Sequence, residues 1–353
     1  MEGLSRRDLG RFGAAAAVTA MMARTGLAQT PAADGLLSHV DPELHPAATA
    51  VMKMPPIQWT NEGIKAMRAG GGPPSPPRLA DVPVEEVKAP VGPGQPDVTL
   101  FVINAKPGTI RPAILHTHGG GHILGSARSE VAYEQALARE LDCVIVTVEY
   151  RLAPQTTYKG SIEDNYAGLK WLYANADKLG VDRKRIVSMG ESAGGTHAAL
   201  LALTARDRRE IPLAAQILIY PMLDDRTGST VQPPPFIGSF GWTAAANRFG
   251  WASFLGMAPG GPKVPAAGVP ARRTDLAGLP PAFIAVGGID LFVSEDINYA
   301  RRLTEAGVPT ELLVLPGAFH GFDRVAPNTR IAKTFTKAKL DALRKAFGEV
   351  PAL

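Results

Sequence analysis

The chain has little cysteine and little excess charge. Cys143 is the only cysteine among 353 residues, so no disulfide can form within the chain. Its place in the apolar run 143–148 predicts a buried thiol that packs as a small hydrophobe. The formal net charge is only +4, an excess too small to indicate nucleic acid or an anionic membrane as a partner. The composition therefore favours an ordinary globular enzyme or binding protein.

Long hydrophobic runs are also missing. The most apolar stretch near the N-terminus, residues 14–23, is too short and too alanine-rich to span a bilayer, so we expect no stable membrane anchor. A twin-arginine pattern, residues 5–9, precedes it, and small residues that a signal peptidase reads, 26–28, follow it. We predict that residues 1–28 are a Tat-type signal peptide and that the protein is periplasmic or secreted. The alternative is an uncleaved extension of a cytoplasmic enzyme.

The most informative motif is G-x-S-x-G at residues 190–194, with Ser192 at its centre. It lies between an apolar run, 185–189, and a small-residue helical run, 196–204. That context predicts a nucleophile elbow, in which a strand ends, the chain turns sharply and a helix begins. The alternative is a plain glycine-serine turn.

A serine needs a base to take its proton. Beyond the helix that follows Ser192, His320 is the only histidine, and it comes directly after the apolar strand 311–315. In folds with a nucleophile elbow, the catalytic residues follow along the chain in the order serine, acid, histidine. We therefore predict His320 as the base, the alternative being a histidine in a solvent-exposed loop.

The acid is expected after the preceding strand. Residues 283–288 form an apolar run of the kind that makes a buried parallel strand, and Asp290 follows it. Asp290 would hold the imidazole tautomer that faces the serine. The competing acids Glu295 and Asp296 lie where a helix starts, and we interpret them as charges at its N-terminus.

A second motif, His118-Gly119-Gly120-Gly121, follows the strand-like run 112–117. Backbone N–H groups in such a loop can stabilise the oxyanion of a tetrahedral intermediate. We predict Gly120, Gly121 and the amide of Ala193 as donors, and we expect His118 to brace the loop. The alternatives are a simple turn or a phosphate cradle, but the chain has neither a P-loop nor a dinucleotide-binding motif.

The same stretch permits a metal site. His116, His118 and His122 lie close together, and two residues apart on a strand means the same face. A zinc site of this type would usually bring carboxylates, whereas glycines separate these histidines. We therefore predict no metal, and we expect His197, on the helix after the serine, to be packed rather than a ligand.

The order and spacing of several motifs resemble the hormone-sensitive-lipase-like esterases, bacterial esterase family IV, within the α/β-hydrolases. The resemblance covers roughly residues 36–348. It implies hydrolysis of carboxylic esters without a cofactor, a triad of Ser192, Asp290 and His320, and oxyanion donors Gly120, Gly121 and Ala193. The motifs that carry it are His118–Gly121, Glu149–Pro154, Glu163-Asp164, Trp171, Gly190–Gly195, Tyr220-Pro221, Gly278–Pro281, Asp290 and His320–Phe322.

Some positions depart from the family pattern. Residue 122 is His where many members carry an aromatic residue, Gln155 stands where a Glu is usual, residue 191 is Glu rather than Asp, and Leu291 replaces a proline. No catalytic group is lost. His122 and Trp242 are candidate substrate-binding residues.

From residue 112 onward, strand-like and helix-like runs alternate, which predicts an α/β-hydrolase fold: a mostly parallel twisted sheet flanked by helices, with a helical cap. Strands are expected at about 84–88, 98–104, 112–117, 143–149, 185–190, 214–220, 282–288 and 310–315. Helices are expected within 36–70 and at about 128–141, 161–179, 193–206, 295–306 and 330–347. The predicted division is signal peptide 1–28, N-terminal cap segment 29–77, core 78–221 and 278–353, and cap insertion 222–277.

The prediction for function is a serine carboxylesterase that hydrolyses short- to medium-chain esters through an acyl-enzyme. The expected partner is a small-molecule ester, and the enzyme is expected to be a monomer or homodimer. Two alternatives remain: another acyl hydrolase on the same triad, such as an amidase, lactonase or lipase, and a non-catalytic ligand receptor.

Overall fold

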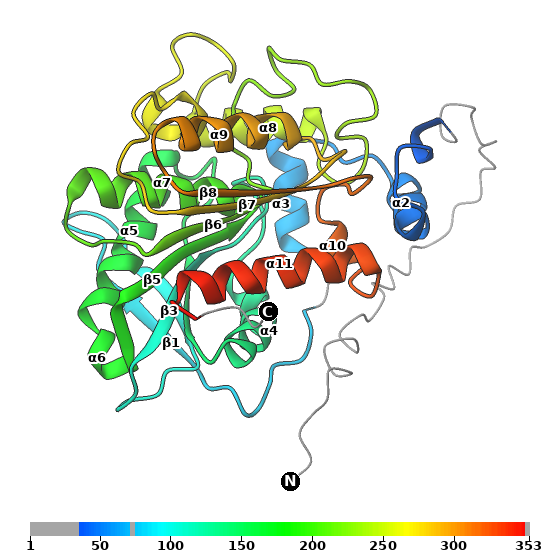
Figure 1. Cartoon of the computed structure of the whole chain (residues 1–353). Helices are drawn as coiled ribbons and strands as arrows, with labels where there is room; N and C mark the ends of the chain where they lie inside the picture. Colours follow the sequence, from blue (N-terminus) through cyan, green and yellow to red (C-terminus); the bar gives the residue numbers. More distant parts are fainter. Residues whose placement is uncertain (1–34, 71–74, 350–353) are drawn as a thin grey trace.

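An eight-stranded sheet forms the centre of the molecule in the computed structural model, which describes residues 35–70 and 75–349 (Figure 1). The strand order is β1-β2-β4-β3-β5-β6-β7-β8. β2 is antiparallel to β1 and β4, and every other pairing is parallel. The strands are β1 (Val84–Ala89), β2 (Val98–Ile103), β3 (Arg111–Thr117), β4 (Val144–Glu149), β5 (Val181–Glu191), β6 (Ala215–Ile219), β7 (Ala282–Gly287) and β8 (Thr310–Leu315).

The predicted strands and the α/β-hydrolase fold are confirmed, because the central strands are continuous runs of buried residues. β3, β6 and β7 are buried along their whole length, as expected of parallel strands covered on both faces. The flanking helices are α4 (Ala127–Glu140), α5 (Tyr158–Ala174), α6 (Ala176–Leu179), α7 (Ala193–Arg208), α9 (Val293–Glu305), α10 (Phe322–Val325) and α11 (Arg330–Ala346).

Helices cover both faces of the sheet. On one face α4 packs on β2 and β4, and α11 packs on β6 and β7. On the other, α5, α7 and α9 lie over the sheet. α7 is buried from Ala193 to Leu203, and its small residues let it lie close to the strands. Between these layers the carboxyl ends of the parallel strands meet at one edge, where such sheets bind ligands.

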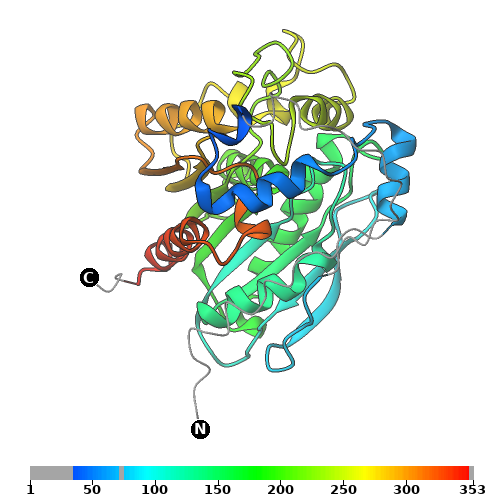
Figure 2. The same cartoon turned by 90° about the vertical axis from the view of Figure 1, so that its right-hand side faces the viewer.

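The N-terminal segment is helical in pieces: η1 (Pro42–Leu44), α2 (His45–Met52) and α3 (Asn61–Ala69). Its first part docks beside the chain that carries His320, since Asp41 N donates to Gly317 O at 3.0 Å and Glu43 pairs with Arg330. Figure 2 shows this blue segment running across the side of the molecule, beside the orange-red chain that leads into α11.

The insertion 222–277 contains one regular helix, α8 (Ala244–Leu255), and two short turns, η2 (Ala266–Gly268) and η3 (Pro270–Arg272). In Figure 1 it is coloured green-yellow to yellow and lies at the top of the molecule. Thr243 caps α8 by accepting from Ala246 N. Sequence periodicity did not locate α8, because its buried face includes Asn247 and Gly250 while Ala245 and Phe249 lie on the less buried side, which leaves little contrast in hydrophobicity between the two faces.

The predicted signal peptide lies outside the described residues. Among residues 35–70 and 75–349, no helix is both long and apolar enough to cross a membrane.

A buried ion pair holds the insertion together. Asp225 is fully buried, and its carboxylate accepts from Arg272 Nε at 2.5 Å and from Gly260 N at 2.5 Å. Removing the arginine would leave a buried carboxylate without its counter-charge, which is more costly than losing a surface pair.

We therefore expect Arg272→Met to lower the free energy of unfolding by about 3 kcal/mol, measured by urea denaturation. The matched control is Arg301→Met, which breaks an exposed pair with Glu305 and should change stability by less than about 1 kcal/mol. An equal decrease in the free energy of unfolding in the two variants would contradict a stabilising role of the Asp225–Arg272 ion pair in the insertion.

Candidate active site

Ser192 occupies the sharp turn between β5 and α7. Its backbone adopts φ 58° and ψ −122°, a conformation that a non-glycine residue rarely takes and that neighbouring structure must enforce. Ser192 N donates to Ile219 O at 2.9 Å, and Met222 N donates to Ser192 O at 3.0 Å. A Cβ on Gly194 would lie 2.0 Å from Thr117 O, so the motif needs glycine there for α7 to approach β3.

His320 and Asp290 lie beside this serine. His320 Nε2 is 2.9 Å from Ser192 Oγ, and His320 Nδ1 is 2.8 Å from Asp290 Oδ2. Phe292 N donates to the other carboxylate oxygen of Asp290 at 3.0 Å. With the proton on Nδ1, the imidazole presents a lone pair to the serine hydroxyl, which is the arrangement a general base requires.

The surroundings of His320 limit its movement. Phe292 meets the imidazole edge-on at a centroid distance of 5.1 Å, and Tyr220 does so at 4.9 Å. Asp296, in the first turn of α9, is fully buried. Burial, together with the charges of Glu295 and Asp290, raises the pKa of Asp296 well above its usual value, which disfavours both the predicted charge at this helix terminus and a second charge beside Asp290.

The predicted helix-terminal position of Glu295 is confirmed, and its carboxylate has a further role. Glu295 Oε1 accepts from Leu223 N at 2.6 Å and from Asp224 N at 3.1 Å. It thereby ties the start of α9 to the chain that leaves β6.

The glycine loop after β3 faces the serine. In the described part of the chain, no hydrogen bond takes up the N–H of Gly120, Gly121 or Ala193, the three groups predicted as oxyanion donors. Gly119 approaches the nucleophile turn so closely that a Cβ there would lie 3.0 Å from Glu191 O. The loop and the N-terminus of α7 are therefore neighbours, as an oxyanion site requires.

His118 braces this loop from behind. Its ring stacks on Tyr150 at 4.2 Å, and its Nδ1 lies 2.8 Å from Gly119 O. Tyr150 also donates its hydroxyl to His118 O at 2.6 Å. Burial lowers the pKa of His118 to about 4, so the ring is neutral and holds the loop by hydrogen bonding.

His122 lies inside an aromatic cluster. It is 1% exposed, stacks on Phe254 of α8 at 3.9 Å and approaches His197, with 3.4 Å between its Nδ1 and Nε2 of His197. Burial lowers the pKa of His122 to about 3. This geometry favours a supporting role beneath the loop over the substrate contact suggested by its position in the sequence. His197 is packed, as expected.

Trp242, the other candidate substrate contact, covers the glycine loop. A Cβ on Gly121 would lie 2.1 Å from its ring. Trp242 Nε1 donates to buried Asn247 at 3.2 Å, and Asn247 in turn donates to Thr227 O at 2.8 Å. Trp59 of the N-terminal segment meets the ring edge-on at 5.3 Å, so both predicted cap segments meet at this residue.

Arg68 was not singled out in the sequence, yet it fastens α3 to the site. Its guanidinium donates to Ile123 O at 2.8 Å, to Ala153 O at 2.6 Å and to Gln155 Oε1 at 2.6 Å. Gln155, which departs from the family pattern, therefore lies outside the aromatic cluster around His122. It accepts a hydrogen bond from Arg68, the residue that joins α3 to the site. Arg68 and Gln155 are 87 residues apart in the sequence, so only the tertiary structure could reveal this contact.

The three histidines considered as a metal site have different partners. His118 stacks on Tyr150, His122 on Phe254, and His116 turns toward Glu134 and Glu191. Among the described residues, the only group with metal-like spacing is the set His116, Glu134 and Glu191. Cys143 is buried and free, as predicted.

Comparisons with known proteins agree with this geometry. A family model described as alpha/beta hydrolase fold matches residues 114–324. Esterase LipI of Mycobacterium tuberculosis is 35% identical over 237 residues, covering 66% of this chain and 72% of LipI. Carboxylesterase NlhH of the same species is 34% identical over 247 residues, covering 67% and 74%. A solved bacterial heroin esterase superposes with a TM-score of 0.77 at 34% identity, covering 88% of this chain and 99% of that one.

The fold and these matches define the chain as an α/β-hydrolase. Within that class it belongs to the hormone-sensitive-lipase-like family, and its enzyme class is carboxylic ester hydrolase.

The contact between Gly121 and Trp242 gives a direct test of the loop. Gly121 has φ 60°, so Gly121→Ala adds backbone strain and also drives the tryptophan ring away. We expect kcat/KM on p-nitrophenyl butyrate to fall by on the order of 10-fold or more.

The control is Gly278→Ala, at φ 72°, where the nearest atom to the added Cβ is 3.8 Å away on Arg206. It carries similar backbone strain outside the site and should leave turnover of the folded enzyme unchanged. A similar loss in both variants would show that the effect is general strain and not loop geometry.

Proposed function

We propose that the protein is a serine carboxylesterase in which Ser192 is the nucleophile, His320 the general base and acid, and Asp290 the residue that orients His320. The observation that carries the proposal is the continuous hydrogen-bonded line from Ser192 Oγ through both nitrogens of His320 to Asp290. A non-catalytic ligand receptor would have no need for this arrangement.

Acylation follows from this line. His320 Nε2 takes the proton of Ser192 as Oγ attacks the ester carbonyl, and Asp290 stabilises the imidazolium that forms. The N–H groups of Gly120, Gly121 and Ala193 are proposed to bind the developing oxyanion, with the N-terminus of α7 adding favourable potential. The imidazolium then gives its proton to the alcohol oxygen, and the alcohol leaves.

Deacylation uses the same groups. Water enters where the alcohol left, and His320 Nε2 accepts its proton as the water oxygen attacks the acyl carbon. Collapse of the second intermediate returns the proton to Ser192 Oγ and releases the acid. The cycle needs only side chains and amides of this chain, a small-molecule ester and water, with no cofactor and no metal.

We propose short- to medium-chain esters as the substrates. Trp242 is held by Asn247 and meets Trp59 at a centroid distance of 5.3 Å, and Trp59 in turn lies 6.5 Å from the ring of Phe249. A rigid aromatic wall beside the oxyanion loop limits the length of chain that can lie there. We retain export through the N-terminal signal as a proposal, with a cytoplasmic enzyme as its alternative.

Ser192→Ala should abolish hydrolysis of p-nitrophenyl butyrate while the far-UV spectrum and melting temperature stay close to wild type. Asp290→Asn should lower kcat by on the order of 10⁴, because the amide favours the wrong imidazole tautomer.

The matched control is Ser294→Ala, an exposed serine on α9, which should retain wild-type turnover. Wild-type turnover in Ser192→Ala would overturn the proposal. So would a fluorophosphonate probe that labels wild type and Ser192→Ala equally.

The proposed acyl limit is tested with p-nitrophenyl esters from acetate to palmitate. Wild type should prefer the short members, and Trp242→Ala should move the preference to longer chains because it opens space beside Gly121. Trp171→Ala on α5, outside the site, should leave the preference unchanged. A wild-type preference for palmitate would contradict the proposed acyl limit and indicate a lipid-binding cap.

A further inference from the structure

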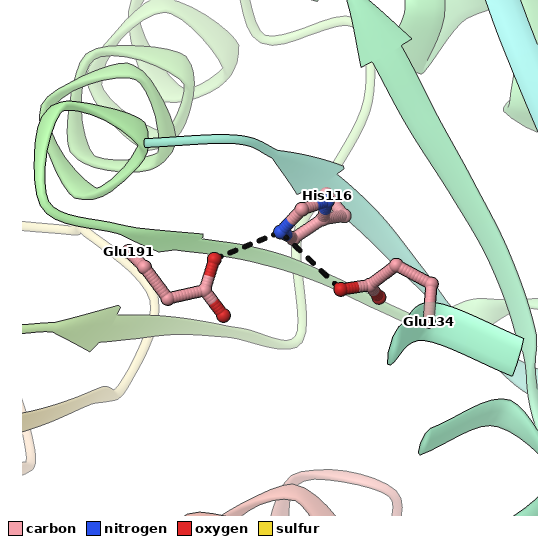
Figure 3. Close-up of side chains that lie close together, drawn as sticks. All are labelled: His116, Glu134 and Glu191. Atoms are coloured by element: carbon pink, nitrogen blue, oxygen red, sulfur yellow. Dashed lines mark hydrogen bonds and ion pairs between the residues drawn. The ribbon is translucent and has the colours of Figure 1, made fainter. Parts of the chain in front are cut away.

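Behind the nucleophile turn lies a buried charged cluster that the proposed mechanism does not use. His116 comes from β3, Glu134 from α4 and Glu191 from the last position of β5 (Figure 3). The three residues are 0%, 2% and 7% exposed. Charged groups are rarely buried this deeply unless they pair with one another, so their arrangement needs a physical explanation.

The imidazole of His116 is the centre of the cluster. Its Nε2 lies 2.9 Å from Glu191 Oε2 and 3.5 Å from Glu134 Oε1, the two contacts drawn in Figure 3. Its Nδ1 lies 2.8 Å from the hydroxyl oxygen of Thr147 on β4. One N–H therefore points between two carboxylates while the opposite nitrogen is anchored to the neighbouring strand.

The charge state follows from these contacts. Burial alone lowers the pKa of His116, but the charges of Glu134 and Glu191 and the hydrogen bond that His116 donates to Glu191 outweigh burial and raise it to about 9. The ring is thus an imidazolium at neutral pH. The other charged or titratable groups that face the cluster are His118 after β3, Glu130 of α4, Cys143 before β4, Tyr220 after β6, Arg324 of α10 and Lys339 of α11.

The position of His116 joins the two halves of the site. The backbone ladder between β3 and β5 ends at the pair Thr117 and Gly190. Glu191 follows Gly190 and directly precedes Ser192. Its side chain accepts a hydrogen bond from His116 and is thereby tied to β3. Two residues after His116, β3 becomes the glycine loop.

We propose that His116 is a positioning residue for ester hydrolysis. It holds Glu191, and through it the Ser192 turn, in register with the oxyanion donors carried by the β3 loop, while Glu134 keeps the imidazolium in place. This inference rests on the proposed serine mechanism and adds to it the contacts of His116 that align the nucleophile with the oxyanion site.

A kinetic signature follows. Alignment of the oxyanion donors with the attacked carbonyl matters more in the transition state than in the bound ester. Misplacement by about 1 Å can cost on the order of 10²-fold in rate. Loss of the hydrogen bond between His116 and Glu191 should therefore lower kcat and leave KM nearly unchanged.

The test uses two substitutions of His116 that differ in which bond they keep. A glutamine amide places an N–H close to the position of Nε2 and can still donate to Glu191, whereas an asparagine amide reaches only the position of Nδ1. We expect His116→Asn to lower kcat on p-nitrophenyl butyrate by about 10- to 100-fold, with KM within about twofold. His116→Gln should recover most of that loss.

Each kcat is expressed per active site, counted by fluorophosphonate titration, so that unfolded protein does not count as slow enzyme. Equal losses in the two variants, or a loss confined to KM, would overturn the proposal. Those results would leave the serine mechanism standing, because wild type would still be labelled at Ser192. Absence of that labelling would instead remove the proposed function itself.

A second readout concerns pH. Because the folded pKa of His116 is raised from 6.5 to about 9, its contribution to stability is complete below about pH 6.5 and is lost as pH rises through about 9. The stability difference between wild type and His116→Gln, from urea denaturation, should therefore shrink between these values. A constant difference would overturn the imidazolium assignment.

The ligand-type atoms of the cluster lie within 4.8 Å of one another, so metal binding is the competing outcome. Dialysis of the intact enzyme against EDTA should leave turnover unchanged. Loss of turnover that zinc restores would replace the positioning role by a metal site.

Discussion

The backbone conformation of Ser192 is the constraint on which the other parts of the site depend. A serine at φ 58° is costly by itself and persists only because its surroundings enforce it. Hydrogen bonds to Ile219 and Met222 hold its backbone from the β6 side, and the glycines of the motif let α7 lie against the sheet. The hydroxyl reaches His320, and α7 begins beside the glycine loop, because this turn is held.

The site is assembled from strand ends that are distant in sequence. Ser192 directly follows β5, the segments after β7 and β8 carry Asp290 and His320, and the segment after β3 carries the glycine loop. Parallel pairing brings these ends to one edge of the sheet. The two cap segments, brought together through Trp59 and Trp242, then cover that edge. In the proposed mechanism the ends of the core strands thus supply the chemistry, while the less regular segments limit access.

Much of this arrangement could be predicted from local patterns. Apolar runs located the strands, because buried parallel strands are continuous hydrophobic stretches. Chain order within the fold paired Ser192 with Asp290 and His320. Helix α8 was missed because its buried face carries Asn247 and Gly250, so the hydrophobicity of its two faces differs little. Arg68 and Glu134 were missed because neither stands in a motif, and each acts through contacts with residues far away in the sequence.

The sequence by itself determined the fold class and the chemical groups at the strand ends, since both depend on short-range hydrophobic patterns and motif spacing. Only the tertiary structure decided how His116, His118 and His122 divide their contacts. The three lie within seven residues, yet one pairs with carboxylates, one stacks on Tyr150 and one stacks on Phe254. Burial and charge around each ring depend on helices α4 and α8 and strand β5, which meet the β3 end only after folding.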